Sequence, residues 1–200
     1  MVSSKIVDMN CDTKPTREQA EEAVSVLLRY IGEATRRHGL IETPARVIRA
    51  YDEFFEGYTK DPTKELSKTF EDIENFDDIV MVKNIEFTSH CEHHMVPIKG
   101  VAHVAYWPNK KVVGISKLAR IVDIYAKRLI SQENLTNEIA NCIEDALGPR
   151  GIGGYIEADH ECMSSRGVKK RNASTVTTTF TGILKEDQNA RARFFEMIKY

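Results

Sequence analysis

Residues 90–97, HCEHHMVP, begin with three histidines, a cysteine and a glutamate in direct succession. The whole chain has only six histidines and four cysteines, so this clustering is unusual. Imidazole and thiolate are the ligands that zinc prefers, and imidazole also exchanges protons near neutral pH. The cluster therefore predicts a metal site, a proton-transfer site, or both.

A second group of such side chains, His160 and Cys162, lies in the segment YIEADHEC at 155–162. We expect this segment to be a strand, in which alternation places both residues on the inward face and Glu157, Asp159 and Glu161 on the outer face. The rise of a strand separates the two residues by about 7 Å, close enough to serve one site. The segment therefore predicts a second half of the same site.

A zinc ion could be held by Cys91, Cys162 and one histidine of the first cluster. Two thiolates and one imidazole leave a fourth position open, which is typical of a catalytic rather than a structural zinc. Such an ion lowers the pKa of a bound water to roughly 7, which makes hydroxide available at neutral pH. Spacing does not choose between His93 and His94 as the ligand.

The histidines of the two groups that do not bind metal have a different predicted role. His93 and His160, if they are not ligands, are placed to deliver and collect protons at the site. We expect ordinary structural roles for Cys142, His38 and His103, while Cys11 lies in the lead-in and is not a convincing further ligand.

An anion site is predicted at the start of the segment GISKLARIVDIYAKRLI, residues 114–130. Ser116 is the expected N-cap, yet Lys117 and Arg120 occupy the first turn, where the helix dipole disfavours cations. Backbone N–H groups and two cations make a phosphate site, to which Arg166 would add a third positive charge. The alternative is a solvated basic surface.

The spacing of apolar residues predicts the elements that position these groups. We expect helices over 16–39, 43–55, 114–130 and 135–149, strands over 78–89, 98–108, 155–162 and 172–184, and a short C-terminal helix. The histidine cluster then lies on the turn between the first two strands. The second helix should bury its apolar residues: Val47, Tyr51, Phe54 and Phe55.

Other parts of the chain are expected to be less regular. Residues 1–15 read as a flexible lead-in, and the polar residues 58–78 as a surface connection. We expect one domain over 16–200, with a helical part over about 16–57 and a core over about 79–200. Glu133 begins a helix, where it either compensates the dipole or accepts N–H groups from a polar heterocycle.

Composition excludes several classes of protein. The chain has 200 residues, 42% of them hydrophobic, and a formal net charge of −2, so no global positive field attracts nucleic acid or an anionic membrane. The first thirty residues lack the apolar segment of an export signal, and no apolar stretch is long enough to span a membrane. We expect an unexported cytoplasmic protein with reduced thiols.

Five motifs make the chain resemble the GTP cyclohydrolase I family: TPARV, SHCEHHMVPIKG, VVGISKLARIV, RLISQENLT and DHECMSSRGVKK followed by STVTTTFTG. The resemblance covers nearly everything from the first helix to the C-terminus. It implies an enzyme with one zinc per chain that hydrolyses GTP at C8, releases formate and forms 7,8-dihydroneopterin triphosphate, the first step of folate biosynthesis.

The resemblance also implies a role for each site residue. The implied metal ligands are Cys91, His94 and Cys162. The implied catalytic residues are His93 and His160, which move protons, and Ser116, which acts near the ribose-derived carbons. The implied substrate contacts are Gln132 and Glu133 for guanine and Lys117, Arg120, Arg166 and Arg46 for the triphosphate.

The fold implied by the resemblance is an α+β tunnelling fold (T-fold). In it, two helices pack on one face of an antiparallel sheet, N-terminal helices precede them, and the sheets of a toroidal homodecamer join into a barrel with active sites between subunits. Ser164 and Ser165, in the stretch CMSSRG, depart from the bulkier apolar residues that the family resemblance leads us to expect at these positions.

The rival functions are a non-catalytic zinc module and a diverged paralogue. A zinc nucleoside deaminase would need a C-x-x-C motif, which the sequence lacks.

Overall fold

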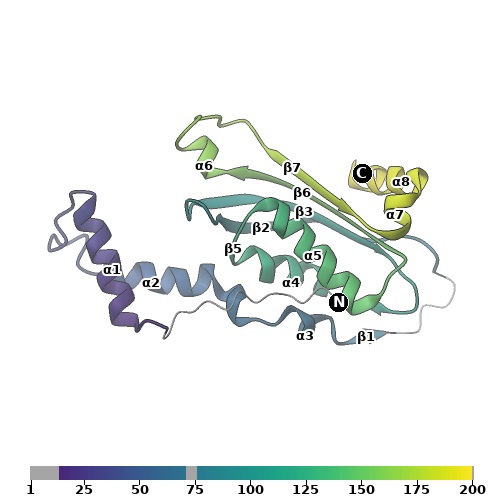
Figure 1. Cartoon of the computed structure of the whole chain (residues 1–200), viewed down its shortest axis with the longest axis horizontal. Helices are drawn as coiled ribbons and strands as arrows, with labels where there is room; N and C mark the ends of the chain where they lie inside the picture. Colours follow the sequence, from purple (N-terminus) through teal and green to yellow (C-terminus); the bar gives the residue numbers. More distant parts are fainter. Residues whose placement is uncertain (1–13, 71–75, 200) are drawn as a thin grey trace. The chain divides into compact units, whose positions relative to one another are not determined.

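A computed structural model of the chain describes residues 14–70 and 76–199 (Figure 1). Cys11 and most of the predicted lead-in therefore lie outside the described residues. Contacts between residues divide the chain into two compact units, Met1–Glu53 and Phe54–Tyr200, which are described separately below. The expectation of a single domain over 16–200 stays a prediction.

The first unit contains α1 (Arg17–Tyr30) and most of α2 (Thr43–Phe54). Thr16 and Gln19 form the predicted capping box, in which each side chain bonds the other residue's backbone N–H. The predicted end of this helix at 36–39 is wrong, because the chain turns at Gly32, which has a φ of 91°. The predicted burial along the second helix is also wrong, since α2 has no buried residue.

The second unit is built around a five-stranded sheet with the order β5-β2-β3-β6-β7. Its strands are β2 (Val80–Cys91), β3 (Pro97–Trp107), β5 (Leu129–Ile130), β6 (Gly151–His160) and β7 (Thr175–Phe180). All neighbours pair antiparallel except β5, which runs parallel to β2. A long hairpin of β2 and β3 therefore carries the histidine cluster at its tip, as predicted.

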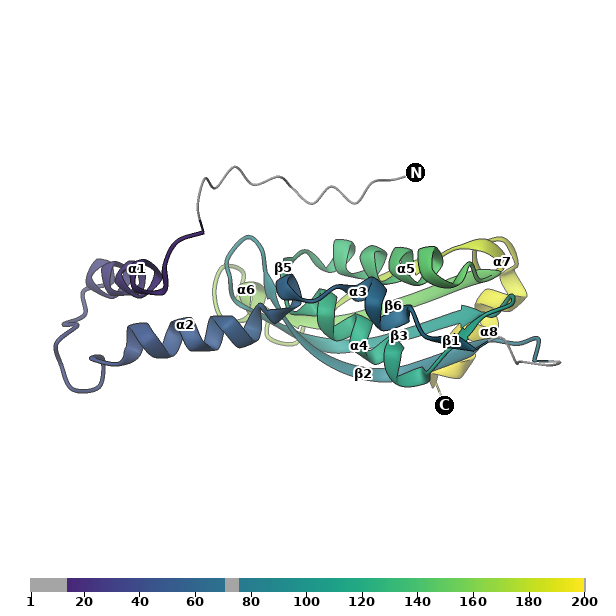
Figure 2. The same cartoon turned by 90° about the horizontal axis from the view of Figure 1, so that it is seen from below.

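Helices cover the two faces of this sheet unequally (Figures 1 and 2). The main core lies between the sheet and the helices α4 (Ile115–Ala126) and α5 (Gln132–Leu147), and it contains Ile156 and Ala158 of β6. A smaller core joins Tyr155, on the opposite face of β6, to α7 (Gly182–Glu186) and α8 (Gln188–Lys199). The predicted α+β architecture, with two helices on one face of an antiparallel sheet, is confirmed.

The stretch predicted as a surface connection is more ordered than expected. It contains the 3-10 helix η1 (Glu56–Thr59), the short helix α3 (Pro62–Leu66) and β1 (Thr69–Phe70), while residues 71–75 lie outside the described part. β1 pairs antiparallel with β4 (Val112–Val113), and Leu66 is buried. The polar composition concealed this because Leu66 and β1 anchor the segment together with polar contacts to distant residues, such as that of Glu65 with Lys117.

Two element boundaries near the candidate site differ from those predicted. Helix α4 begins after Gly114, so Ser116 is not its N-cap and makes no capping hydrogen bond there. Strand β6 ends at His160, and Cys162 lies in the short helix α6 (Glu161–Ser164) rather than on the strand. The chain leaves the sheet after His160, which allows Cys162 to turn towards the hairpin.

Candidate functional site

The turn between β2 and β3 is closed by its own backbone. The Cys91 N–H donates to the Val96 carbonyl at 2.9 Å, and the Met95 N–H donates to the Cys91 carbonyl at 2.7 Å. Met95 adopts the left-handed conformation with a φ of 55°, which reverses the chain within a few residues. The turn therefore holds the side chains between Cys91 and Met95 beyond the end of the sheet.

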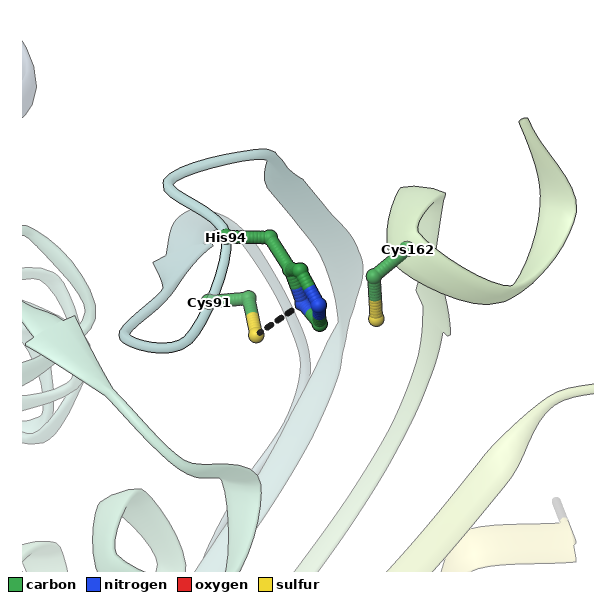
Figure 3. A group of neighbouring side chains, drawn as sticks. All are labelled: Cys91, His94 and Cys162. Atoms are coloured by element: carbon green, nitrogen blue, oxygen red, sulfur yellow. Dashed lines mark hydrogen bonds between the residues drawn. The ribbon is translucent and has the colours of Figure 1, made fainter. Parts of the chain in front are cut away.

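Cys91, His94 and Cys162 form a group of possible metal ligands (Figure 3). The ligand atoms of the three side chains lie within 4.8 Å of one another. Among the described residues, no fourth histidine, cysteine or carboxylate joins the group. Two thiols and an imidazole at this separation could hold a metal ion, and the soft donors suit zinc with one position left open.

His93 is distinguished from His94 by its position relative to Cys162. Both histidines place Nδ1 near the Cys91 Sγ, at 3.7 Å for His93 and 3.8 Å for His94. Only His94 belongs to the group that also contains the Cys162 Sγ. The side chain of His93 is 68% exposed, and its Nε2 lies 3.6 Å from a carboxylate oxygen of Glu92. Of the two histidines that spacing left open, only His94 is grouped with both sulfur atoms.

Arg166 lies beside the metal group. Its Nη1 is 3.1 Å from the His94 Nε2. Because a guanidinium has no acceptor, the His94 Nε2 must be the acceptor in this contact. Burial, and then the neighbouring Cys91, raise the pKa of the Cys162 thiol. The arrangement brings the positive charge of Arg166 close to the Cys162 thiol.

His160 is held by a hydrogen bond from the other side. Its Nε2 lies 2.7 Å from the Oε1 of Gln132, the first residue of α5. Burial lowers the pKa of His160, and the carboxylates of Glu133 and Asp159 partly oppose that shift. Glu133 is exposed in the first turn of α5, next to the buried Gln132.

The cations at the start of α4 have a partner that the sequence did not identify. Glu65 of α3 accepts from the Lys117 Nζ at 2.7 Å and from the Arg120 Nη1 at 3.3 Å. The hydrogen bond from Lys117 lowers the pKa of the Glu65 carboxyl. An anion does compensate these cations, as the helix dipole requires, but here it is a carboxylate. No sequence pattern links the residues, which are far apart in the chain.

Two other predicted site residues are exposed. Ser116 lies in the first turn of α4 next to the exposed Ile115. Arg46 lies on α2 in the first unit, where it forms an ion pair with Glu42 one turn earlier.

His90 is the member of the histidine cluster for which the sequence indicated no role. It is buried against the rings of Phe54 and Phe55, with ring centroids 4.8 and 5.2 Å away. Burial lowers the pKa of this imidazole, and its Nδ1 has no hydrogen-bond partner among the residues that the structure describes. His90 therefore packs as an aromatic side chain beneath the turn. Its position within β2, just before the last residue of that strand, could have indicated this role.

The ordinary roles predicted for two residues outside the site are confirmed. Cys142 is buried within the main core. His103 is buried, and its Nδ1 accepts from the backbone N–H of Asn84 at 3.4 Å. His38 does not end α1, which stops at Tyr30, but lies exposed in the turns that follow.

In the described part of the chain, no helix is both long and apolar enough to cross a membrane.

Residues 20–199 match the family model described as GTP cyclohydrolase I. A protein of Maricaulis maris (strain MCS10) named GTP cyclohydrolase 1 is 51% identical over 188 residues, which are 94% of this chain and 92% of that protein. A protein of Hyphomonas neptunium (strain ATCC 15444) with the same name is 53% identical over 184 residues, 92% of this chain and 89% of that protein. Among solved structures, the archaeosine synthase QueF-Like in the apo form matches with a TM-score of 0.46 and 18% identity, over 54% of this chain and 97% of that chain.

Proposed function

The chain belongs to the GTP cyclohydrolase I family, and we propose that it converts GTP and water to 7,8-dihydroneopterin triphosphate and formate. The observation that carries the proposal is that two thiols and an imidazole meet at one point of a chain from this family. This reaction is the first step of folate biosynthesis. It opens the imidazole ring of the purine at C8, removes that carbon and closes a larger ring with ribose carbons.

Cys91, His94 and Cys162 are the proposed ligands of one zinc ion per chain. Their soft donor atoms lie within 4.8 Å of one another, which suits such an ion. When bound, zinc supplies Lewis-acid chemistry that activates water near neutral pH. The remaining functions fall to the other side chains around the group.

His93 and His160 are the proposed proton carriers. His93 is exposed at the turn, so it can contact a substrate that binds there. His160, in contrast, is held in place by its hydrogen bond with Gln132. Breaking the C8–N bonds requires a proton on each departing nitrogen, and two imidazoles can deliver and recover those protons. Ser116 is proposed to act near the ribose-derived carbons during ring closure.

Substrate binding is proposed to use charges on both sides of the site. Glu133 is exposed and can accept two N–H groups of guanine. Lys117 and Arg120, one turn apart, would bind the triphosphate, and doing so would exchange the Glu65 carboxylate for phosphate oxygens. Two further cations complete the proposed phosphate contacts: Arg166 and Arg46.

A homo-oligomer is the proposed form of the enzyme. Apolar side chains that one chain leaves exposed on and after α1 include Leu27, Tyr30 and Ile31, which are 62%, 86% and 68% exposed. Such side chains favour association, and the family resemblance makes that assembly a toroidal decamer whose sheets join into a barrel. We place the protein in the cytoplasm, where GTP is available.

Turnover of GTP by the zinc-loaded protein tests this function directly. Formate and a dihydropterin that becomes fluorescent on oxidation should form together and in equal amounts. The Cys91→Ser variant, which lacks one proposed ligand, should lose zinc and both products. Zinc-loaded wild-type protein that yields neither product would instead favour a non-catalytic zinc module or a diverged paralogue.

A further inference from the structure

Gln132 is predicted from the resemblance to contact guanine, but its side chain is only 2% exposed. Its amide nitrogen donates to the Ile156 carbonyl at 3.1 Å, the Thr175 carbonyl at 2.9 Å and the Thr177 Oγ1 at 3.1 Å. Its amide oxygen accepts from His160 at 2.7 Å. Two N–H hydrogens are thus shared among three acceptors, so no donor of this amide is left for a ligand.

The orientation of the amide follows from the chemistry of its neighbours. The carbonyls of Ile156 and Thr175 can only accept hydrogen bonds, so they must face the NH₂ group of Gln132 and not its oxygen. Turning the amide over would place three buried oxygen atoms together without a hydrogen between them. Strands β6 and β7 therefore fix the Gln132 oxygen towards His160.

The hydroxyl groups behind Gln132 support the same orientation. The Thr136 hydroxyl donates to the Gln132 backbone carbonyl at 2.8 Å, which uses its only hydrogen. In the 2.7 Å contact between the two threonine hydroxyls, Thr177 must then be the donor. Thr177 keeps its lone pairs for the Gln132 NH₂ group. The two threonine hydroxyls are thus both oriented, and neither competes for the Gln132 oxygen.

We propose that Gln132 is a positioning residue, which fixes His160 in the tautomer that carries hydrogen on Nε2 and leaves Nδ1 as the atom that exchanges protons with the substrate. The amide oxygen cannot donate, so the hydrogen in the 2.7 Å contact must belong to His160. The role in catalysis rests on the proposed function, whereas the tautomer does not. Guanine recognition is left to the exposed Glu133.

The tautomer can be measured in the wild-type zinc-loaded protein. Magic-angle-spinning NMR of protein labelled with ¹⁵N-histidine distinguishes protonated from unprotonated ring nitrogens, and a His160→Gln sample assigns the signals. We expect neutral His160 to have a protonated Nε2 and an unprotonated Nδ1. A protonated Nδ1 with a bare Nε2 would overturn the proposal without any need for a variant of Gln132.

The catalytic part is tested with Gln132→Met, which keeps the length of the side chain but removes its polar atoms. We expect kcat for GTP to fall by about 10 to 100-fold, the size of effect that misplacing a catalytic group produces, while KM changes less than about 3-fold. Gln132→Glu keeps an acceptor for His160 and should keep the Nε2–H tautomer, while the loss of the NH₂ group that donates to the Ile156 and Thr175 carbonyls should lower its Tm. The control is Thr178→Val, which changes an exposed residue of β7 next to Thr177.

Three outcomes separate the explanations. A guanine contact at Gln132 would instead raise KM and change the preference for GTP over inosine triphosphate, as we expect for Glu133→Gln; that result would overturn the positioning role. Loss of zinc or a lower Tm in Gln132→Met would indicate a structural effect, and the wild-type tautomer would then decide. If the wild type does not turn over GTP, the proposed function fails while the tautomer measurement stands.

Discussion

Zinc affinity should distinguish His94 from its neighbour His93, although both rings lie equally close to Cys91. Their Nδ1 atoms are 3.8 and 3.7 Å from the Cys91 Sγ, but only His94 also groups with Cys162. We therefore expect His94→Ala to lose most of its zinc affinity and His93→Ala to keep it.

The magnitude follows from the number of ligands. Zinc sites with four protein ligands bind with roughly 10–16 kcal/mol, or about 2.5–4 kcal/mol for each ligand. Removing His94 should therefore weaken binding by about 10² to 10³-fold. His93→Ala should leave zinc affinity unchanged, because the 68% exposed side chain of His93 lies outside the group that contains Cys162.

Competition against a series of zinc buffers, with the metal measured by mass spectrometry, gives both affinities on one scale. His38→Ala, which removes an exposed histidine outside the group, is the control and should match the wild type. A His93→Ala variant without zinc, together with a fully loaded His94→Ala variant, would falsify the assignment. Equal losses in both would mean that the ion is shared between the two rings.

Three further predictions concern the sulfur atoms and the phosphate contacts. Removal of zinc under oxidising conditions should form a disulfide between Cys91 and Cys162, because their sulfur atoms lie within 4.8 Å of each other. Activity should then return only when both reductant and zinc are added. Recovery with zinc alone while the disulfide persists would argue against both cysteines binding the same ion. Lys117→Ala or Arg120→Ala should lower kcat/KM for GTP by about 10 to 100-fold, because each variant loses a charge-assisted hydrogen bond to the triphosphate. Zinc content and the slow turnover of guanosine should not change. Full efficiency on GTP would show that these cations are only a solvated basic surface. Glu65→Gln should lower KM for GTP, because it removes the carboxylate that both cations bind, and an unchanged or higher KM would show that Glu65 does not compete with phosphate.

The residues of the metal group were predictable because their chemistry is local. Cys91 and His94 lie three positions apart on a turn that the flanking strands predict. Cys162 was found from its neighbour His160, although the strand assigned to it was wrong. A cysteine can bind from a strand or from the short helix α6, so the error did not change the predicted ligand.

The sequence also determined the α+β class and the main helices and strands, because apolar periodicity reflects the face that each element buries. Capping at Thr16 was equally local, since both partners lie within one turn. The end of α1 was not, because a glycine within a helical pattern ends the helix in some proteins and continues it in others.

Contacts between distant parts of the chain required the tertiary structure. Glu65 meets Lys117 across 52 positions, and Gln132 meets Thr177 across 45, so neither pair leaves a periodic or spacing signal. The same holds for the choice between His93 and His94, which depends on where Cys162 arrives from another element. Residue types and short spacings thus determined which chemical groups the protein carries, whereas packing of α3, α5 and β7 decided which groups meet, because side-chain contacts depend on distances through space.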